Sequence, residues 1–440
     1  MRNMIRLLVS MTFAALTLGP IAVPCVAQTS TAPIQAIKLL APQTGWASAG
    51  GKLFWTTTAG AQWKDITPKK SHVYQAITSV FFLDSTRGWI LQKCADRHDD
   101  TFDDTCYELA STINAGASWS MSRIKVSDPD PESGFSDHGW LNFADPLHGW
   151  IILKVNRSTA VSFGVLIRTE DGGKTWTQLD EPPIAGRFHF TTATTGWMAG
   201  GPDHALYVTR DGGKSWQIGT LPDPKQIGEI YSTDYDLPTF ENDSHGALPV
   251  RYDVGAMGGK QASTVVLFVT TDAGKSWSLG KTLAGLPQNY GTGMPYPSAV
   301  VSNGTLRAGF LNAEKQFCLQ TLGLNGSSEK RTCKFIPRFS ALEELSFVDL
   351  NQGWALANGG LLSTSDGGVS WQEITPVAAQ PAQTPHHSAV QPRSSPETVS
   401  SPVGSALTLP SPDLVLGGHT SARLGFDKSF HICNERMTEA

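Results

Sequence analysis

The pattern D-x-G-x-[ST]-W, a short acidic turn that leads into a tryptophan, occurs four times in this 440-residue chain, and two weaker copies precede it. The full copies are TEDGGKTWTQL (169–179), TRDGGKSWQIG (209–219), TTDAGKSWSLG (270–280) and STSDGGVSWQEI (363–374), and the weaker ones are TTTAGAQW (56–63) and TINAGASW (112–119). Successive copies are separated by 56, 57, 40, 61 and 94 residues, and the last interval spans two repeats. A recurring period of this length indicates a repeat architecture.

A second element precedes most of these acidic turns. It reads FFLDSTRGWI at 81–90, NFADPLHGWI at 142–151, HFTTATTGWM at 189–198 and SFVDLNQGWA at 346–355. The last unit divides into four short strand-like runs, ELSFVD, GWALA, GLLSTSD and SWQEIT, so the acidic turn joins the third strand (C) to the fourth (D). Four strands per unit are typical of a propeller blade. We therefore predict an all-β, seven-bladed β-propeller with four-stranded antiparallel blades.

The blade without an acidic turn is expected at 294–337, where strands can be drawn around two Asn-Gly turns. Cys318 and Cys333 are symmetric about the second of these turns, which predicts a disulfide that could replace the acidic turn; the alternative is two free buried thiols. The predicted propeller covers 34–375. Its blades are 34–68, 74–124, 138–180, 186–221, 236–281, 294–337 and 341–375. Because the first and last blades are both complete, closure of the ring needs no strand exchange.

The repeated aspartates and tryptophans have a structural and a functional interpretation. An aspartate can accept backbone hydrogen bonds within a turn, and tryptophan covers the hairpin with apolar surface. Catalytic acids or calcium ligands would need further carboxylates nearby and would not recur in every blade. The structural interpretation is favoured for Asp171, Asp211, Asp272, Asp366, Trp176, Trp216, Trp277 and Trp371.

The two ends of the chain differ in character from the repeats. Arg2, Arg6, an apolar run at 7–19 and the small residues before position 28 predict a signal peptide over 1–27, with an uncleaved anchor as the alternative. The mature protein is therefore expected outside the cytoplasm, secreted or periplasmic, without a membrane span. Residues 376–420 are rich in proline and serine and predict a linker. Residues 421–440 are either a disordered tail or the start of a second domain.

Long insertions are predicted on the face opposite the acidic turns, which makes that face the expected binding surface. They lie at 95–105, 126–137, 222–235 and 255–263. The first insertion carries an acidic cluster, flanked by a predicted Cys94–Cys106 disulfide, that could hold a calcium ion or a cationic partner or could be a solvated acidic loop. Its members are Asp96, His98, Asp99, Asp100, Asp103 and Asp104. Otherwise no metal or cofactor is expected.

Charge excludes one class of partner. The formal net charge is −5, and no run of lysine and arginine is long enough to form a phosphate-binding face. Nucleic acid is therefore not an expected ligand.

The repeats resemble the BNR or Asp-box motif, and their combination with F-x-D-x-x-x-G-W over 34–375 resembles the photosystem II stability and assembly factor family. This resemblance implies a non-catalytic scaffold that binds a protein partner. Asp-box repeats also occur in sialidases and other glycosidases, so a glycan-binding or glycan-hydrolysing propeller is the rival. The Phe-Arg-Ile-Pro element that a sialidase carries before its first box is absent from the sequence. Two carboxylates of a glycosidase could still come from distant loops.

The C-terminal sequence LGFDKSFHICNERMTEA resembles the start of bacterial glycoside-hydrolase-like barrel domains, which open on a Gly-Phe-Asp strand. The resemblance covers fewer than twenty residues. It implies that Asp427 would be a site residue of a domain that continues beyond this sequence, and it leaves Cys433 without a partner within the chain.

Overall fold

The computed structural model describes residues 33–69, 77–93, 106–127, 134–156, 162–201, 204–224, 227–242, 244–255, 261–283, 298–323 and 329–374. The chain divides into two units, Met1–Pro381 and Ala382–Ala440, and every described residue belongs to the first. The signal peptide, the acidic cluster, the linker and the tail predicted above lie outside the described residues.

The described residues form seven antiparallel sheets, each built from consecutive strands, which we number as blades 1 to 7. Blade 1 contains β1 (Ile34–Ala41), β2 (Thr44–Ala49), β3 (Lys52–Thr56) and β4 (Lys64–Asp65), and blade 2 contains β5 (Ile77–Phe82), β6 (Gly88–Lys93), β7 (Cys106–Thr112) and β8 (Ser120–Lys125). Blade 3 contains β9 (Gly134–Phe143), β10 (Gly149–Asn156), β11 (Ser162–Thr169) and β12 (Thr177–Gln178). Blade 4 contains β13 (Phe188–Phe190), β14 (Gly196–Gly200), β15 (Ala205–Thr209) and β16 (Gln217–Ile218). Blade 5 contains β17 (Glu229–Tyr235), β18 (Thr239–Phe240), β19 (Gly246–Gly255), β20 (Gln261–Thr270) and β21 (Ser278–Leu283); blade 6 contains β22 (Ser298–Ser302), β23 (Thr305–Leu311), β24 (Gln316–Gly323) and β25 (Glu329–Phe335); a 3-10 helix (Pro337–Ala341) precedes blade 7, which contains β26 (Leu342–Phe347), β27 (Gly353–Ala357), β28 (Gly360–Thr364) and β29 (Gln372–Ile374).

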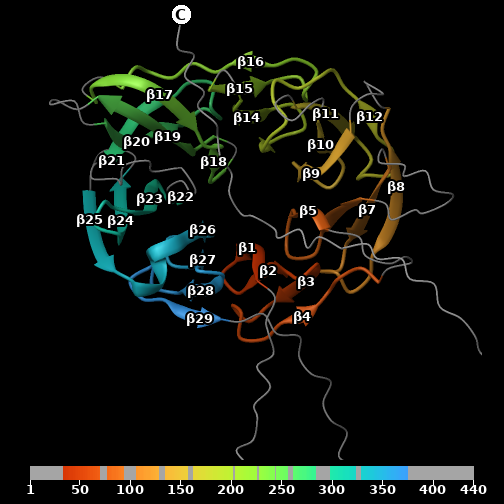
Figure 1. Cartoon of the computed structure of the whole chain (residues 1–440), viewed down its shortest axis with the longest axis horizontal. Coiled ribbons are helices and arrows are strands. Elements are labelled where there is room, and N and C mark those ends of the chain that lie inside the picture. Colours follow the sequence, from red (N-terminus) through yellow and green to blue (C-terminus); the bar gives the residue numbers. More distant parts are fainter. Residues whose placement is uncertain are drawn as a thin grey trace, which may run out of the picture. The chain divides into compact units, whose positions relative to one another are not determined.

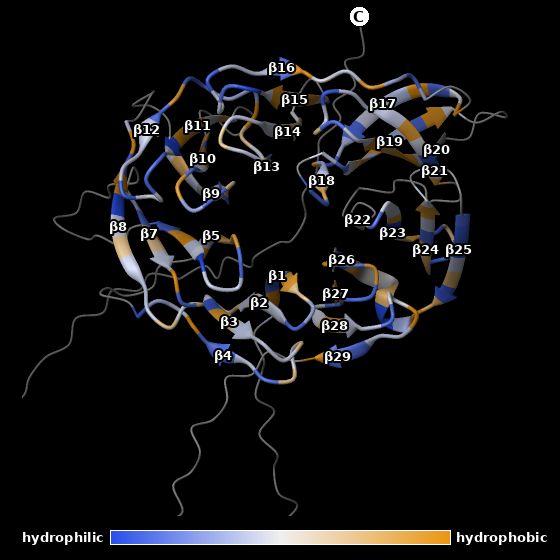
Figure 2. Cartoon of the chain, turned by 180° about the vertical axis from the view of Figure 1, so that it is seen from behind, coloured by the Kyte–Doolittle hydropathy of each residue, from blue (hydrophilic) through white to orange (hydrophobic). Residues whose placement is uncertain are grey.

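The blades stand in a ring around a central axis, with the last strand of each blade outermost (Figure 1). The first strand is innermost in the other blades, whereas in blade 5 β18 lies nearest the axis. The predicted seven-bladed propeller is confirmed, and blades 1 and 7 are each built from their own four consecutive strands, so the ring closes without strand exchange. The outer strands β4 and β25 are mostly hydrophilic (Figure 2). Polar outer strands protect the free sheet edges from pairing with other chains.

Blade 5 departs from the strand assignment made from sequence. Residues 229–235 were expected within a crossover, but they form β17, which pairs with β19. The innermost strand is then interrupted, and β18 resumes the pairing with β19. Pro238 lies in this interruption and has no N–H to donate to the ladder, which is why the strand breaks there.

The hydrophobic core is divided among the seven boundaries between neighbouring blades. At the boundary of blades 2 and 3, for example, Leu91 and Tyr107 pack with Leu141 and Ile151. The same arrangement closes the ring, because Ile37 of blade 1 belongs to one cluster with residues of blade 7. Each blade is therefore stabilised by the two blades beside it.

The repeated phenylalanine and the Gly-Trp pair form a clamp between blades. Trp89 of blade 2 stacks on Phe143 of blade 3 with ring centroids 3.6 Å apart, and Trp150 stacks on Phe190 of blade 4 at the same distance. A Cβ on Gly149 would lie 2.3 Å from the Phe143 ring, so only glycine fits beneath it. This close approach explains the spacing F-x-D-x-x-x-G-W.

The ring has two faces of different construction. The turn face carries the A–B and C–D turns, and the two turns of one blade are joined by a backbone hydrogen bond, such as Gly212 N–H to Thr194 O at 2.8 Å in blade 4. The loop face carries the B–C turns and the connections between blades. The predicted separation of the acidic turns from the long insertions follows from this alternation of strand direction.

Candidate functional site

The four acidic-turn aspartates are engaged within their own turns. Oδ2 of Asp272 accepts the Ser276 hydroxyl at 2.6 Å, and Oδ1 accepts the Ser276 N–H at 2.9 Å. These hydrogen bonds lower the pKa of Asp272 to about 2. Asp171, Asp211 and Asp366 make the corresponding bonds to Thr175, Ser215 and Ser370. A carboxylate committed in this way holds the turn together.

A buried threonine two residues before each acidic position was not singled out from the sequence. Oγ of Thr209 donates to Asp211 at 2.8 Å and accepts the N–H of Gly213 at 2.9 Å, so it links both ends of the turn. The sequence does contain a signal for this residue, because all six copies of the turn carry a threonine at this position. The six are Thr56, Thr112, Thr169, Thr209, Thr270 and Thr364.

The predicted tryptophans lie beside the same turns. Nε1 of Trp176 donates to Gly173 O at 3.2 Å, and Nε1 of Trp371 donates to Gly368 O at 3.1 Å. Trp216 and Trp277 meet aromatic rings of their surroundings edge to face. Neither the aspartates nor the tryptophans converge on a common site, since they are distributed around the ring.

A cavity of about 350 Å³ lies at the axial end of the turn face, and we call it the axial cavity. Its lining comes from the ends of the innermost strands of blades 2 to 5 and from their turns. The lining residues are Phe81, Leu83, Phe143, Ala144, His189, Phe190, Thr191, Thr192, Thr195, Phe240, Glu241, Asn242 and Ala273. Its volume lies within the range of small-ligand sites, and its lining combines phenylalanine rings with polar side chains.

The imidazole of His189 is held in one orientation and one tautomer. Oδ1 of the buried Asn142 accepts the Phe190 N–H at 2.9 Å, which turns the Asn142 amide NH2 toward Nδ1 of His189 at 3.3 Å. Because an amide NH2 only donates, Nδ1 accepts and the ring proton lies on Nε2. Burial, reinforced by the positive charge of Lys38, lowers the pKa of His189 to about 4. The imidazole is therefore a neutral donor.

Charged side chains of several blades converge on the axis. Lys38 of blade 1 acts electrostatically on His189, on Asp236 and on Glu344 of blade 7. Arg187 donates to Asp236 at 3.2 Å. Burial raises the pKa of Asp236 and that of Glu344, although both cations oppose it. The two cations and two carboxylates balance one another.

The loop face has an exposed apolar pair at the start of β17. Ile230 is 40% exposed and Tyr231 is 60% exposed. The predicted acidic cluster and the predicted Cys94–Cys106 disulfide lie outside the described residues. Among the residues that are described, no group of three or more His, Cys, Asp or Glu side chains could hold a metal ion.

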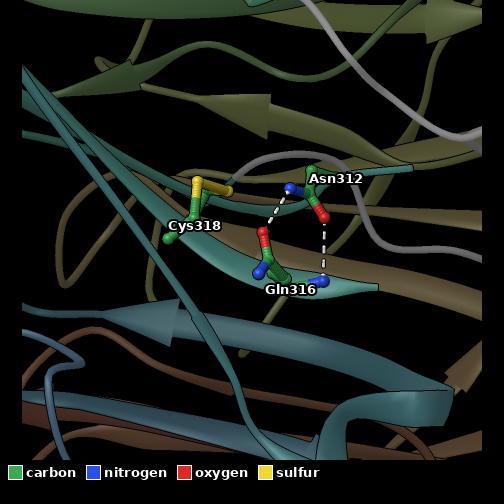
Figure 3. Close-up of a disulfide and its surroundings, with 4 residues drawn as sticks. Asn312, Gln316 and Cys318 are labelled. Carbon is green, nitrogen blue, oxygen red and sulfur yellow. Dashed lines mark hydrogen bonds between the residues drawn. A yellow bond between two sulfur atoms is a disulfide. The ribbon is translucent and has the colours of Figure 1, made fainter. Parts of the chain in front are cut away.

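The predicted Cys318–Cys333 disulfide is present and joins β24 to β25. It lies beside the B–C turn of blade 6, which Asn312 and Gln316 close with hydrogen bonds of 3.0 and 2.8 Å (Figure 3). The expectation that the disulfide replaces an acidic turn was wrong in position, because it is at the loop-face end of the strands. The symmetric spacing of the two cysteines around the Asn-Gly turn predicts that they pair. It does not predict which end of the hairpin the disulfide lies nearer to.

Comparisons with known proteins return propellers of several kinds. No protein-family model matches the chain, and no curated protein matches its sequence. YCF48 bound to D1 peptide is 15% identical with a TM-score of 0.45, over 76% of this chain and 94% of that chain. The six-bladed lectin of Aleuria aurantia, a fungal protein that recognises fucose, is 10% identical with a TM-score of 0.34, over 66% and 89%. The GH74 enzyme of Niastella koreensis is 12% identical with a TM-score of 0.24, over 78% and 69%. At these levels the comparisons carry no conclusion about ligand or activity.

Proposed function

We propose that this chain is a non-catalytic propeller that binds a protein partner through its loop face, as an assembly-type scaffold outside the cytoplasm. The observation that carries the proposal is the exposed pair Ile230 and Tyr231. Exposed apolar and aromatic side chains on a rigid support are typical of protein interfaces, and tyrosine is enriched among residues that dominate binding energy.

The support beneath this pair is rigid. β17 pairs with β19 on both sides of an irregularity at Tyr231, between Ile230 and Ser232. Asp234 on β17 forms an ion pair with Arg251 and lies 3.3 Å from Nδ1 of His204. Ser232 donates to Asp253 at 2.8 Å and adds a further link between the two strands. An apolar centre with a fixed polar surround is the usual construction of a protein interface.

An extracytoplasmic location is part of the same proposal. The Cys318–Cys333 disulfide is compatible with an oxidising compartment, and the predicted signal peptide over 1–27 points to the same place. Within the described part of the chain, no helix is long and apolar enough to cross a membrane.

The test is co-purification of cross-linked partners from the native extracytoplasmic fraction with the full chain, a Tyr231→Ser variant and an Ile218→Ser control. Ile218 is 64% exposed but lies on the outer strand β16. We expect a partner that is retained by the control and lost with Tyr231→Ser. A partner retained equally by both variants would overturn the proposal for this face.

The predicted acidic cluster is tested separately. A variant with Asp99, Asp100, Asp103 and Asp104 changed to Asn should lose the same partner if that loop contributes to the interface. Retention of the partner in this variant, together with its loss in Tyr231→Ser, would restrict the interface to the described end of β17.

A further inference from the structure

The axial cavity is separate from the proposed protein site, since it opens at the turn face and Ile230 and Tyr231 lie on the loop face. Its polar atoms come mostly from the A–B turns of blades 4 and 5. The hairpin ladders of β13 with β14 and of β18 with β19 hold these turns in place. The cavity is therefore built into the rigid part of the ring, which is a requirement for selective binding of a small ligand.

The polar groups of the axial cavity include both donors and acceptors. Nε2 of His189 carries a proton that takes no part in the contact with Asn142, so it can donate a hydrogen bond to a ligand. Glu241 accepts the N–H of Asn303 through Oε1, and its second carboxylate oxygen can accept a further hydrogen bond. Among the lining residues, Thr195 adds a half-buried hydroxyl that can serve in either direction.

The four phenylalanines divide into two pairs. Phe143 and Phe190 are each covered on one ring face by a stacked tryptophan, are approached closely by a glycine and are almost completely buried. Phe81 and Phe240 are only partly buried and can offer apolar surface to a ligand.

Charge disfavours two ligand classes. Among the described residues that line the cavity, Glu241 is the one charged side chain, and its carboxylate disfavours an anion even though the charge of Lys38 reaches His189. A cation would find Glu241 but would also face the Nε2 proton of His189. Lys38 and Arg187 lie further along the axis, where Asp236 and Glu344 balance them.

We propose that the axial cavity binds one neutral sugar ring, because hydroxyl groups alone satisfy both kinds of polar partner at once. One hydroxyl accepts from Nε2–H of His189, and another donates to the carboxylate of Glu241. The apolar C–H face of the sugar packs on Phe81 or Phe240, which removes apolar surface from water on both sides. The volume of about 350 Å³ limits the enclosed part of the ligand to a small unit.

The experiment titrates the full chain with a panel of methyl glycosides of glucose, galactose, mannose, fucose and N-acetylglucosamine, followed by saturation-transfer NMR and calorimetry. The test variant is Glu241→Gln, which keeps an oxygen for the Asn303 N–H but loses the charge. The control is Glu314→Gln, an exposed carboxylate in the B–C turn of blade 6, on the loop face. The melting temperature of each variant confirms that it is folded.

We expect at least one glycoside to bind to the unmodified chain, and its affinity to fall about tenfold in Glu241→Gln and not in Glu314→Gln, since a charge-assisted hydrogen bond is lost. A Thr195→Val variant should weaken the same glycoside. No binding by any glycoside, or binding that Glu241→Gln leaves unchanged, would overturn the proposal. The protein-binding proposal would survive either result, because it is tested by Tyr231→Ser at the other face.

Discussion

The two faces of the ring differ in how uniform their turns are from blade to blade. On the turn face, six C–D turns repeat one hydrogen-bond pattern, and each is tied to the A–B turn of its own blade. On the loop face, the B–C connection varies from two residues between β27 and β28 to twelve between β6 and β7. One face is therefore constrained by the scaffold, and the other is able to vary.

The two faces therefore differ in where they can accommodate a ligand. Most polar atoms of the turn face are occupied by the turns themselves, so the space for a ligand there is at the axis, where side chains of different blades meet. The loop face has no such constraint, and its exposed apolar pair stands on a strand that the repeat pattern did not predict. The predictions below test whether the turn face stabilises the ring as strongly as this comparison implies.

The largest loss of stability should follow when the phenylalanine–tryptophan clamp between two blades is disrupted. Trp150→Ala removes a fully buried ring that stacks on Phe190, and it should lower the free energy of unfolding by about 3–5 kcal/mol. Denaturation in urea measures this loss. Ile218→Ala, an exposed position on β16, is the control and should change the free energy by less than about 0.5 kcal/mol. Equal effects at the two positions would contradict the clamp.

The disulfide should have the next largest effect. It closes a loop with a sequence separation of 15, and replacing Cys318 and Cys333 by alanine should cost about 3 kcal/mol. Reduction of the unmodified chain by dithiothreitol should reproduce most of the loss in the same denaturation experiment. A variant as stable as the unmodified chain would show that the loop face contributes no stability through this link.

The threonine of the acidic turn should have a smaller effect. Thr209→Val removes the buried hydroxyl that joins Asp211 to Gly213, and it should cost about 1–3 kcal/mol because a buried N–H loses its acceptor. Thr209→Ser keeps the hydroxyl and should recover part of this loss. Two variants of equal stability would show that the hydroxyl is not what matters at this position.

The smallest expected change in stability is the pH-dependent contribution of one acidic turn, that of Asp272. The pKa of Asp272 is lowered to about 2 in the folded chain, so its ionised form stabilises the fold above the ordinary aspartate pKa of about 4. This stabilisation is lost as the pH falls from 4 toward 2. The difference in unfolding free energy between the unmodified chain and Asp272→Asn should therefore shrink over that range. A constant difference would show that the carboxylate does not titrate as described.

Much of the fold could be predicted from the sequence, because its signals are local and repeated. The six turns and the four Gly-Trp elements recur at intervals that only a blade architecture accommodates, and the two cysteines of blade 6 are symmetric about a turn. β17 was missed because it precedes the interruption at Pro238, which resembles the end of a crossover. The threonines of the acidic turn were missed although their spacing was visible, since threonine is common in strands.

The axial cavity could not be predicted, since no segment of the sequence contains it. His189 lies in a weak copy of the phenylalanine element, Asn142 belongs to another blade, and Glu241 follows a two-residue strand. Their proximity depends on how neighbouring blades pack, and the spacing of residues within one segment does not predict packing between blades. Only the closed ring brings their polar atoms together at the axis.

The closure of the ring has a further consequence for engineering. Blade 7 meets blade 1 through side-chain packing, as any two neighbouring blades do, and no shared sheet marks this boundary. The chain ends could therefore lie at another boundary between blades, with the cyclic order of the blades unchanged. A circular permutant that joins Ile374 to Ile34 by a short linker and opens the chain between two other blades should assemble the same ring, with its ends moved to a place of the experimenter's choice.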